Sequence, residues 1–76
     1  MNGDDTDVKI HRNPAVDHVL RYFRFDHLKA ELQDVSRDFA ALAQITADRA
    51  PNNPETTVAL RKLLEAKDAA VRAVLP

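Results

Sequence analysis

The sequence predicts an all-α fold, in which a short helix precedes an antiparallel two-helix hairpin that assembles as a homo-oligomer. Composition favours helix, because alanine, leucine and charged residues dominate the 76-residue chain and it contains a single glycine. Asn-Pro pairs at 13–14 and 53–54 are typical of helix starts. Between these pairs, apolar residues recur at alternating spacings of four and three, the period of a helix that packs along one stripe.

The chain is long enough for one domain, whose core is marginal in a single copy. A chain of this size buries only about 60% of the surface that its unfolded form exposes. It has no cysteine, which excludes disulfides and thiolate metal sites. Small scaffolds without such cross-links commonly oligomerise. We therefore expect the chain to associate with copies of itself.

Charge and hydropathy exclude two classes of partner. Eleven Lys and Arg against twelve Asp and Glu give a formal net charge of −1, whereas a protein that coats DNA is strongly basic. We expect no DNA partner, although a local basic cluster can still hold a small anion. The longest uncharged stretch, 39–47, has nine residues, and a membrane span needs roughly 20. The acidic N-terminus does not resemble a signal peptide, so a cytoplasmic setting is expected.

The N-terminal part divides into an arm and a short helix. Residues 1–12 are polar and acidic and predict a flexible arm, while residues 13–76 are expected to form the folded domain. Asn13 caps the short helix and Pro14 occupies its first position. The helix is expected to end near Arg24 or Phe25, because Asp26 is a plausible cap for the next one. Its apolar side carries Val16, Val19, Leu20 and Phe23.

A long helix is predicted from about His27 to Arg49, a rod of roughly 35 Å. Pro51 disfavours helix at the preceding residue and so ends it. Its seam consists of Leu28, Leu32, Val35, Phe39, Leu42 and Thr46, and Ala43 and Ile45 widen the stripe.

The last helix is predicted from Pro54 to about Leu75, with Asn53 as its cap. Because the polar connector 51–54 is so short, the two long helices must fold back as an antiparallel hairpin. The last helix carries two apolar stripes: Ala59, Leu63, Ala66, Ala70 and Ala73 form one, and Leu60, Leu64, Val71, Val74 and Leu75 form the other. We expect the small alanines to allow close approach of the hairpin partner. The second stripe then needs the short helix or another subunit, and we prefer a subunit interface.

No reaction centre is apparent in the sequence. The histidines at 11, 18 and 27 lack the spacing of a helical metal site, and no glutamate–histidine pair of the di-iron type occurs. Ser36 has no clear histidine and carboxylate partners for nucleophilic catalysis. We therefore expect no enzyme, no metal and no cofactor.

The run Arg-Tyr-Phe-Arg-Phe at 21–25 suggests binding instead. Phe23 continues the apolar side of the short helix, which leaves Tyr22 free to offer a flat face. Stacking of such a ring on a nucleobase is worth about 1–3 kcal/mol. The alternative interpretation is that Tyr22 is an amphipathic residue at the edge of the core.

The last helix also carries cations. Arg61, Lys62, Lys67 and Arg72 are interrupted by Glu65 and Asp68, so these charges either neutralise one another at helical spacing or grip a phosphate beside small alanines. At the start of this helix, Thr57 and its neighbours offer amides and hydroxyls to an anion, although Glu55 opposes that role.

Three segments resemble the phage anti-CBASS sponge family, whose helical hairpin is shared with anti-Thoeris sponges. They are 22–28 (YFRFDHL), 32–40 (LQDVSRDFA) and 57–73 (TVALRKLLEAKDAAVRA), and the likeness spans about residues 14–75. The resemblance implies a hexamer that sequesters cyclic di- and trinucleotides without cleaving them. In the cytoplasm of the infected bacterium, this would keep the host's defence effector from being activated.

The resemblance also implies roles for single residues. In the family a tyrosine stacks on a base and a basic residue about fifteen positions later contacts the ligand, which Tyr22 and Arg37 match. Arginine stands here where the family has lysine, which keeps the charge and changes the donor geometry. Arg72 matches the arginine that serves the trinucleotide. Further candidate ligand-binding residues are Lys29, Arg61 and Lys62. The alternative function is a small structural or regulatory helical module that binds another protein.

Overall fold

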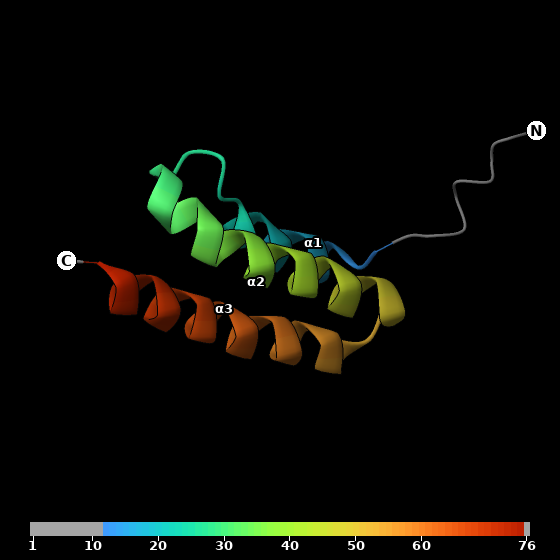
Figure 1. Cartoon of the computed structure of the whole chain (residues 1–76). Helices are drawn as coiled ribbons and strands as arrows, with labels where there is room; N and C mark the ends of the chain where they lie inside the picture. Colours follow the sequence, from blue (N-terminus) through green and yellow to red (C-terminus); the bar gives the residue numbers. More distant parts are fainter. Residues whose placement is uncertain (1–11, 76) are drawn as a thin grey trace, which may run out of the picture.

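The computed structural model describes residues 12–75 and places them in four helical elements (Figure 1). These are α1 (Pro14–Leu20), the 3-10 helix η2 (Arg21–Phe23), α2 (Ala30–Arg49) and α3 (Pro54–Val74). Helices α2 and α3 run antiparallel, and α1 packs against both of them. The predicted all-α fold is confirmed for this part of the chain. The predicted arm lies outside the described residues, except for Arg12.

Both predicted asparagine caps are confirmed. The side-chain oxygen of Asn13 accepts a hydrogen bond from the backbone N–H of Ala15 at 2.9 Å. Asn53 accepts in the same way from the N–H of Glu55 at 2.8 Å. Each bond satisfies one of the amides that a helix start leaves without a partner, and a proline follows each cap, where no amide is lost.

The closed end of the hairpin is tied by hydrogen bonds across the turn. The Thr56 hydroxyl donates to the carbonyl oxygen of Ala50 at 2.6 Å, and the N–H of Asn13 donates to the carbonyl oxygen of Pro51 at 2.9 Å. The second bond attaches the start of α1 to the turn between α2 and α3. All three helices are therefore fixed together at this end of the molecule.

Helix α2 begins at Ala30, so the predicted start near His27 is wrong. Asp26 does not cap it, because its carboxylate pairs with Arg24 at 3.4 Å instead. Lys29 is the N-cap, and its side chain makes no capping bond. Residues 24–29 consequently form a loop between η2 and α2, which we call the connecting loop.

The core lies where α1 and η2 meet the hairpin. Its fully buried apolar residues are Val16, Val19, Phe23, Ala43, Ala47 and Leu60. The expected core role of Phe23 is confirmed, since this side chain is 3% exposed.

The predicted seam of α2 faces the core only in part, since Ala43 is buried and Phe39 packs against the buried cluster. Leu42 and Ile45 are 48% and 49% exposed, and the buried positions are Ser36, Ala43 and Ala47. Small side chains at these positions let the two backbones approach closely, so they occupy the helix–helix contact although their hydropathy is low. The large apolar residues of the seam lie on the flank next to this contact.

The predicted alanine contact of α3 is present only in part, because Leu63 of that stripe packs against the core while three of its alanines are exposed. Ala59, Ala66 and Ala73 are exposed, whereas Leu60 is fully buried and Leu64 is half-buried. The stripe of larger residues therefore supplies the contact with α2 and α1 along the first half of α3. At its end, Val74 and Leu75 remain about half exposed.

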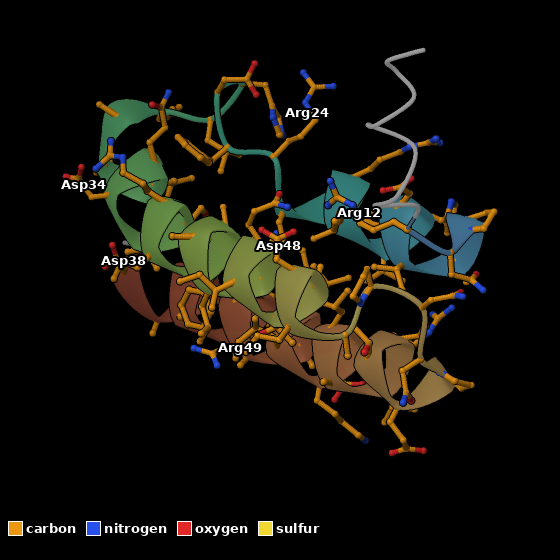
Figure 2. All side chains as sticks on the ribbon, turned by 90° about the vertical axis from the view of Figure 1, so that its right-hand side faces the viewer. Arg12, Arg24, Asp34, Asp38, Asp48 and Arg49 are labelled. Atoms are coloured by element: carbon orange, nitrogen blue, oxygen red, sulfur yellow. The ribbon has the colours of Figure 1, made fainter. Side chains whose placement is uncertain are left out.

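The Leu42 flank of α2 and the alanine stripe of α3 lie on the same side of the hairpin, away from α1. Thr57 shares a cavity with Asn13 and Ala15 at the start of α1, and Gln33 bonds to the connecting loop, so these residues mark the covered side. Figure 2 shows Arg49 pointing away from α1, and Leu42 lies two turns earlier on the same flank of α2. We call the uncovered side the open face. It consists of Leu32, Val35, Phe39, Leu42 and Thr46 on α2, and of Ala59, Leu63, Ala66, Ala70 and Ala73 on α3.

Candidate functional site

An open cavity of about 430 Å³ lies where η2 passes into the connecting loop. Arg21, Tyr22, Arg24 and His27 line it. It combines one aromatic ring with two guanidinium groups and one imidazole. Cations and a flat ring are the groups that bind a phosphate and a planar base, respectively.

Tyr22 is held at the surface by its neighbour in the sequence. Phe23 is buried in the core, and successive residues of a 3-10 helix point about 120° apart, so Tyr22 is turned outward and is 56% exposed. The ring of His18, one turn earlier, meets the Tyr22 ring edge-on, with centroids 5.6 Å apart and planes at 83°. Tyr22 is therefore exposed as expected, and its role as a stacking surface stays a prediction.

The two arginines of the cavity differ in their partners. Arg24 pairs with Asp26 at 3.4 Å, and both side chains are largely exposed. The hydrogen bond from Arg24 lowers the pKa of Asp26 below its ordinary value, and a backbone hydrogen bond and the charge of Arg24 act in the same direction. Within residues 12–75, Arg21 makes no ion pair. The cavity thus presents one partly neutralised guanidinium and one that has no carboxylate partner among the described residues.

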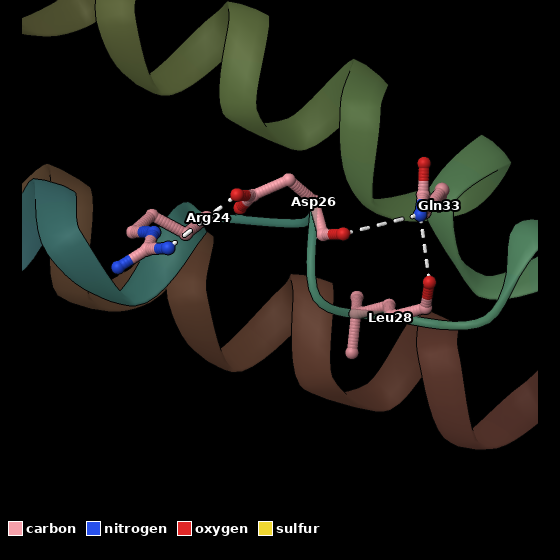
Figure 3. A network of polar contacts seen from close by, with 4 residues as sticks. All are labelled: Arg24, Asp26, Leu28 and Gln33. Carbon is pink, nitrogen blue, oxygen red and sulfur yellow. Dashed lines mark hydrogen bonds and ion pairs between the residues drawn. The ribbon is translucent and has the colours of Figure 1, made fainter.

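Helix α2 holds the connecting loop in place through Gln33 (Figure 3). Its side-chain amide donates to the carbonyl oxygen of Leu28 at 2.7 Å and approaches that of Asp26 at 3.5 Å. The shorter contact is the stronger hydrogen bond. Because Arg24 and His27 belong to this loop, Gln33 fixes one wall of the cavity relative to the hairpin.

Arg37 does not line the Tyr22 cavity. Its guanidinium lies 5.7 Å from the centre of the Phe25 ring and 3.2 Å from the carboxylate of Asp34. The first contact is a cation–π interaction that places Arg37 beside the connecting loop. The predicted pair of Tyr22 and Arg37 is therefore not assembled as a single pocket within one chain. Lys29 is exposed where the same loop enters α2.

The predicted site residues of α3 lie apart from the Tyr22 cavity as well. Arg61, Lys62 and Arg72 are exposed. Thr57 is half-buried and lines a smaller cavity of about 210 Å³ with Asn13, Ala15, Asn53 and Pro54. Among the described residues, Lys67 and Asp68 make the one ion pair of α3, at 3.1 Å, and Lys67 is 13% exposed. In that part of the chain neither Glu65 nor Asp68 pairs with Arg61 or Arg72.

The run that suggests binding contains Arg21 and Arg24, but the sequence does not single out these arginines or His27 as site residues. A signal existed for the two arginines, because residues three apart in a 3-10 helix lie on the same side. No comparable signal existed for His27, whose position depends on the path of the connecting loop.

Within residues 12–75, no three His, Cys, Asp or Glu residues are placed to hold a metal ion. No helix of this part is long and apolar enough to cross a membrane. Comparison with known proteins brings no match, since no family model fits the chain and no curated protein or solved structure is significantly similar. The resemblance to the sponge family therefore depends on the quoted segments alone.

Proposed function

We propose that this protein is a phage anti-defence protein that binds cyclic di- and trinucleotide messengers and holds them without cleaving them. In the cytoplasm of an infected bacterium, this sequestration blocks activation of the CBASS effector. The observation that carries the proposal is the exposed Tyr22 ring in one cavity with Arg21 and Arg24. A cyclic oligonucleotide presents flat bases and phosphodiesters together, which is the chemistry that this cavity complements.

The resemblance to anti-CBASS sponges supports the same proposal from the sequence. It assigns base stacking to Tyr22, which the structure leaves exposed and braced by His18. It assigns ligand contacts to Arg37 and Arg72, neither of which lines the Tyr22 cavity of the same chain. We propose that these two arginines, and the further candidates Lys29, Arg61, Lys62 and Thr57, act in clefts formed between subunits.

A homo-oligomer, a hexamer by the resemblance, is part of the proposal. The open face leaves the large apolar side chain of Leu42 48% exposed, and its alanines permit a second helix to approach closely. Association of copies through such a face buries this surface.

Sedimentation velocity with and without cyclic GMP–AMP, followed by recovery of the ligand, tests the proposal. We expect an oligomer that co-sediments with the nucleotide, and chemically unchanged nucleotide after the complex is denatured. Cleaved nucleotide would identify an enzyme and contradict sequestration. A monomer that leaves all nucleotide in the supernatant would contradict the proposal as a whole.

The alternative is a structural or regulatory helical module that binds another protein through the open face. The half-exposed Leu42 on that face favours it as a second candidate. The two functions separate in the same experiment, because an adaptor that binds protein alone does not carry cyclic nucleotide with it.

A further inference from the structure

The Arg24–Asp26 ion pair occupies one of the two guanidinium groups of the Tyr22 cavity. The two side chains are 67% and 71% exposed, and their closest atoms are 3.4 Å apart. Ion pairs at this exposure contribute little to stability, because water solvates both charges nearly as well. The pair can therefore be exchanged for a better anion at small cost.

Arg21 and Arg24 both line the Tyr22 cavity. They lie three residues apart across η2, and the N–H of Arg24 donates to the carbonyl oxygen of Arg21. Side chains at this spacing in a 3-10 helix leave the backbone on the same side. A phosphate group can accept two parallel hydrogen bonds from a guanidinium, which suits it better than the single contact that Asp26 makes with Arg24.

The backbone of the connecting loop does not need to move for this exchange. Gln33 holds the carbonyl oxygens of Leu28 and Asp26 from α2, while the Asp26 carboxylate extends away from that contact into solvent (Figure 3). A change of side-chain rotamer at Asp26 is enough to release Arg24. The Asp26 carboxylate and the ligand phosphate thus compete for Arg24 while the backbone of the connecting loop stays in place.

We infer that Arg21 and Arg24 form the phosphate-binding part of the site, and that Asp26 is an internal competitor which a bound phosphate displaces. The inference rests on the proposed function, because it treats the Tyr22 cavity as the ligand site. It assigns the anion to residues of the cavity other than Tyr22, with the phosphate placed beside the tyrosine ring. Asp26 then limits how tightly the free cavity holds any phosphate anion.

Calorimetric titration of Asp26→Asn with inorganic pyrophosphate and with cyclic GMP–AMP tests the inference. We expect the variant to bind both probes about threefold more tightly than the parent, since it frees Arg24 at the scale of an exposed ion pair. Asp17→Asn is the matched control, because it removes an exposed carboxylate from another arginine, Arg12, which has no part in the proposed site. The control should bind as the parent does.

A double-mutant comparison separates competition from a general change in charge. In an Arg24→Gln background the Asp26→Asn substitution should bring no gain, because the cation that it frees is gone. An equal gain from Asp17→Asn, or no gain from Asp26→Asn, would overturn the inference. If pyrophosphate binding responds as expected while cyclic GMP–AMP does not bind at all, the anion site stands and the proposed function fails. If cyclic GMP–AMP binds equally to parent and Asp26→Asn, the proposed function stands and the inference fails.

Discussion

The side-chain amide of Gln33 donates a hydrogen bond to the carbonyl oxygen of Leu28 at 2.7 Å, which joins α2 to the connecting loop. This contact links the scaffold to the candidate site, because the loop carries Arg24 and His27 while α2 belongs to the hairpin. It is partly buried, so water does not fully replace it when it is lost.

Replacing Gln33 with methionine should therefore loosen the connecting loop. We expect a loss of about 1 kcal/mol in the free energy of unfolding, measured by urea denaturation, because a partly buried carbonyl oxygen loses its donor. Amide exchange should accelerate in residues 24–29 and stay unchanged in α3. Gln44→Met is the matched control, since Gln44 bonds only to the exposed carboxylate of Asp48 on the same helix. Equal effects of the two substitutions would contradict the role given to Gln33.

Asn53→Ala should destabilise the hairpin by about 1 kcal/mol, because the first free amide of α3 loses its acceptor. Asn53→Ser restores a capping oxygen and should recover most of that loss. Thermal unfolding of the parent and the two variants measures both effects. A serine variant as unstable as the alanine variant would show that capping is not the source.

The helix ends were predictable from the sequence because their causes are local. An Asn-Pro pair supplies a capping oxygen and a residue that needs no amide partner, and Pro51 disfavours helix at Ala50, so each boundary depends on a few adjacent residues. The start of α2 was predicted wrongly because it does not depend on adjacent residues alone. Asp26 has the chemistry of a cap, and the choice between capping and pairing with Arg24 depends on the path of the loop.

The orientation of the helices was less predictable than their extent. Hydropathy pointed to the Leu42 flank of α2, whereas the close contact uses Ser36, Ala43 and Ala47. Small residues contribute little to a hydropathy pattern, yet they decide how near two helices can approach. The candidate site shows the same contrast. The exposure of Tyr22 could be predicted from the expected burial of Phe23, whereas the position of His27 in the cavity depends on the path of the folded loop.

Leu42→Glu should reduce self-association of the protein. The substitution places a charge in the middle of the open face, where it must be desolvated if copies associate there. Val58→Glu is the matched control, because Val58 is exposed to a similar extent and lies outside the open face, on α3. Sedimentation equilibrium should show a lighter species for Leu42→Glu alone. Equal dissociation by both variants, or by neither, would contradict assembly through the open face.

The Asp26 carboxyl should titrate below 3.8, because the hydrogen bond from Arg24 favours its charged form. A carboxyl with a depressed pKa stabilises the fold above its unfolded value, and this contribution is lost as the pH falls through the lower folded value. Any stability from this pair should therefore disappear only in the acid range below 3.8. Carbon-detected NMR of Asp26 should show its pKa rising in Arg24→Gln. An unchanged titration in that variant would contradict the pairing.

Calorimetric titration of cyclic GMP–AMP into the parent, Tyr22→Phe and Tyr22→Ala tests the central claim most directly. Phenylalanine keeps the ring and should bind nearly as the parent does, whereas alanine removes the stacking surface and should weaken binding about tenfold or more. Circular dichroism should show the same helix content in all three, because Tyr22 is outside the core. Absence of any binding by the parent, or equal affinity of the alanine variant, would contradict a nucleotide site at Tyr22.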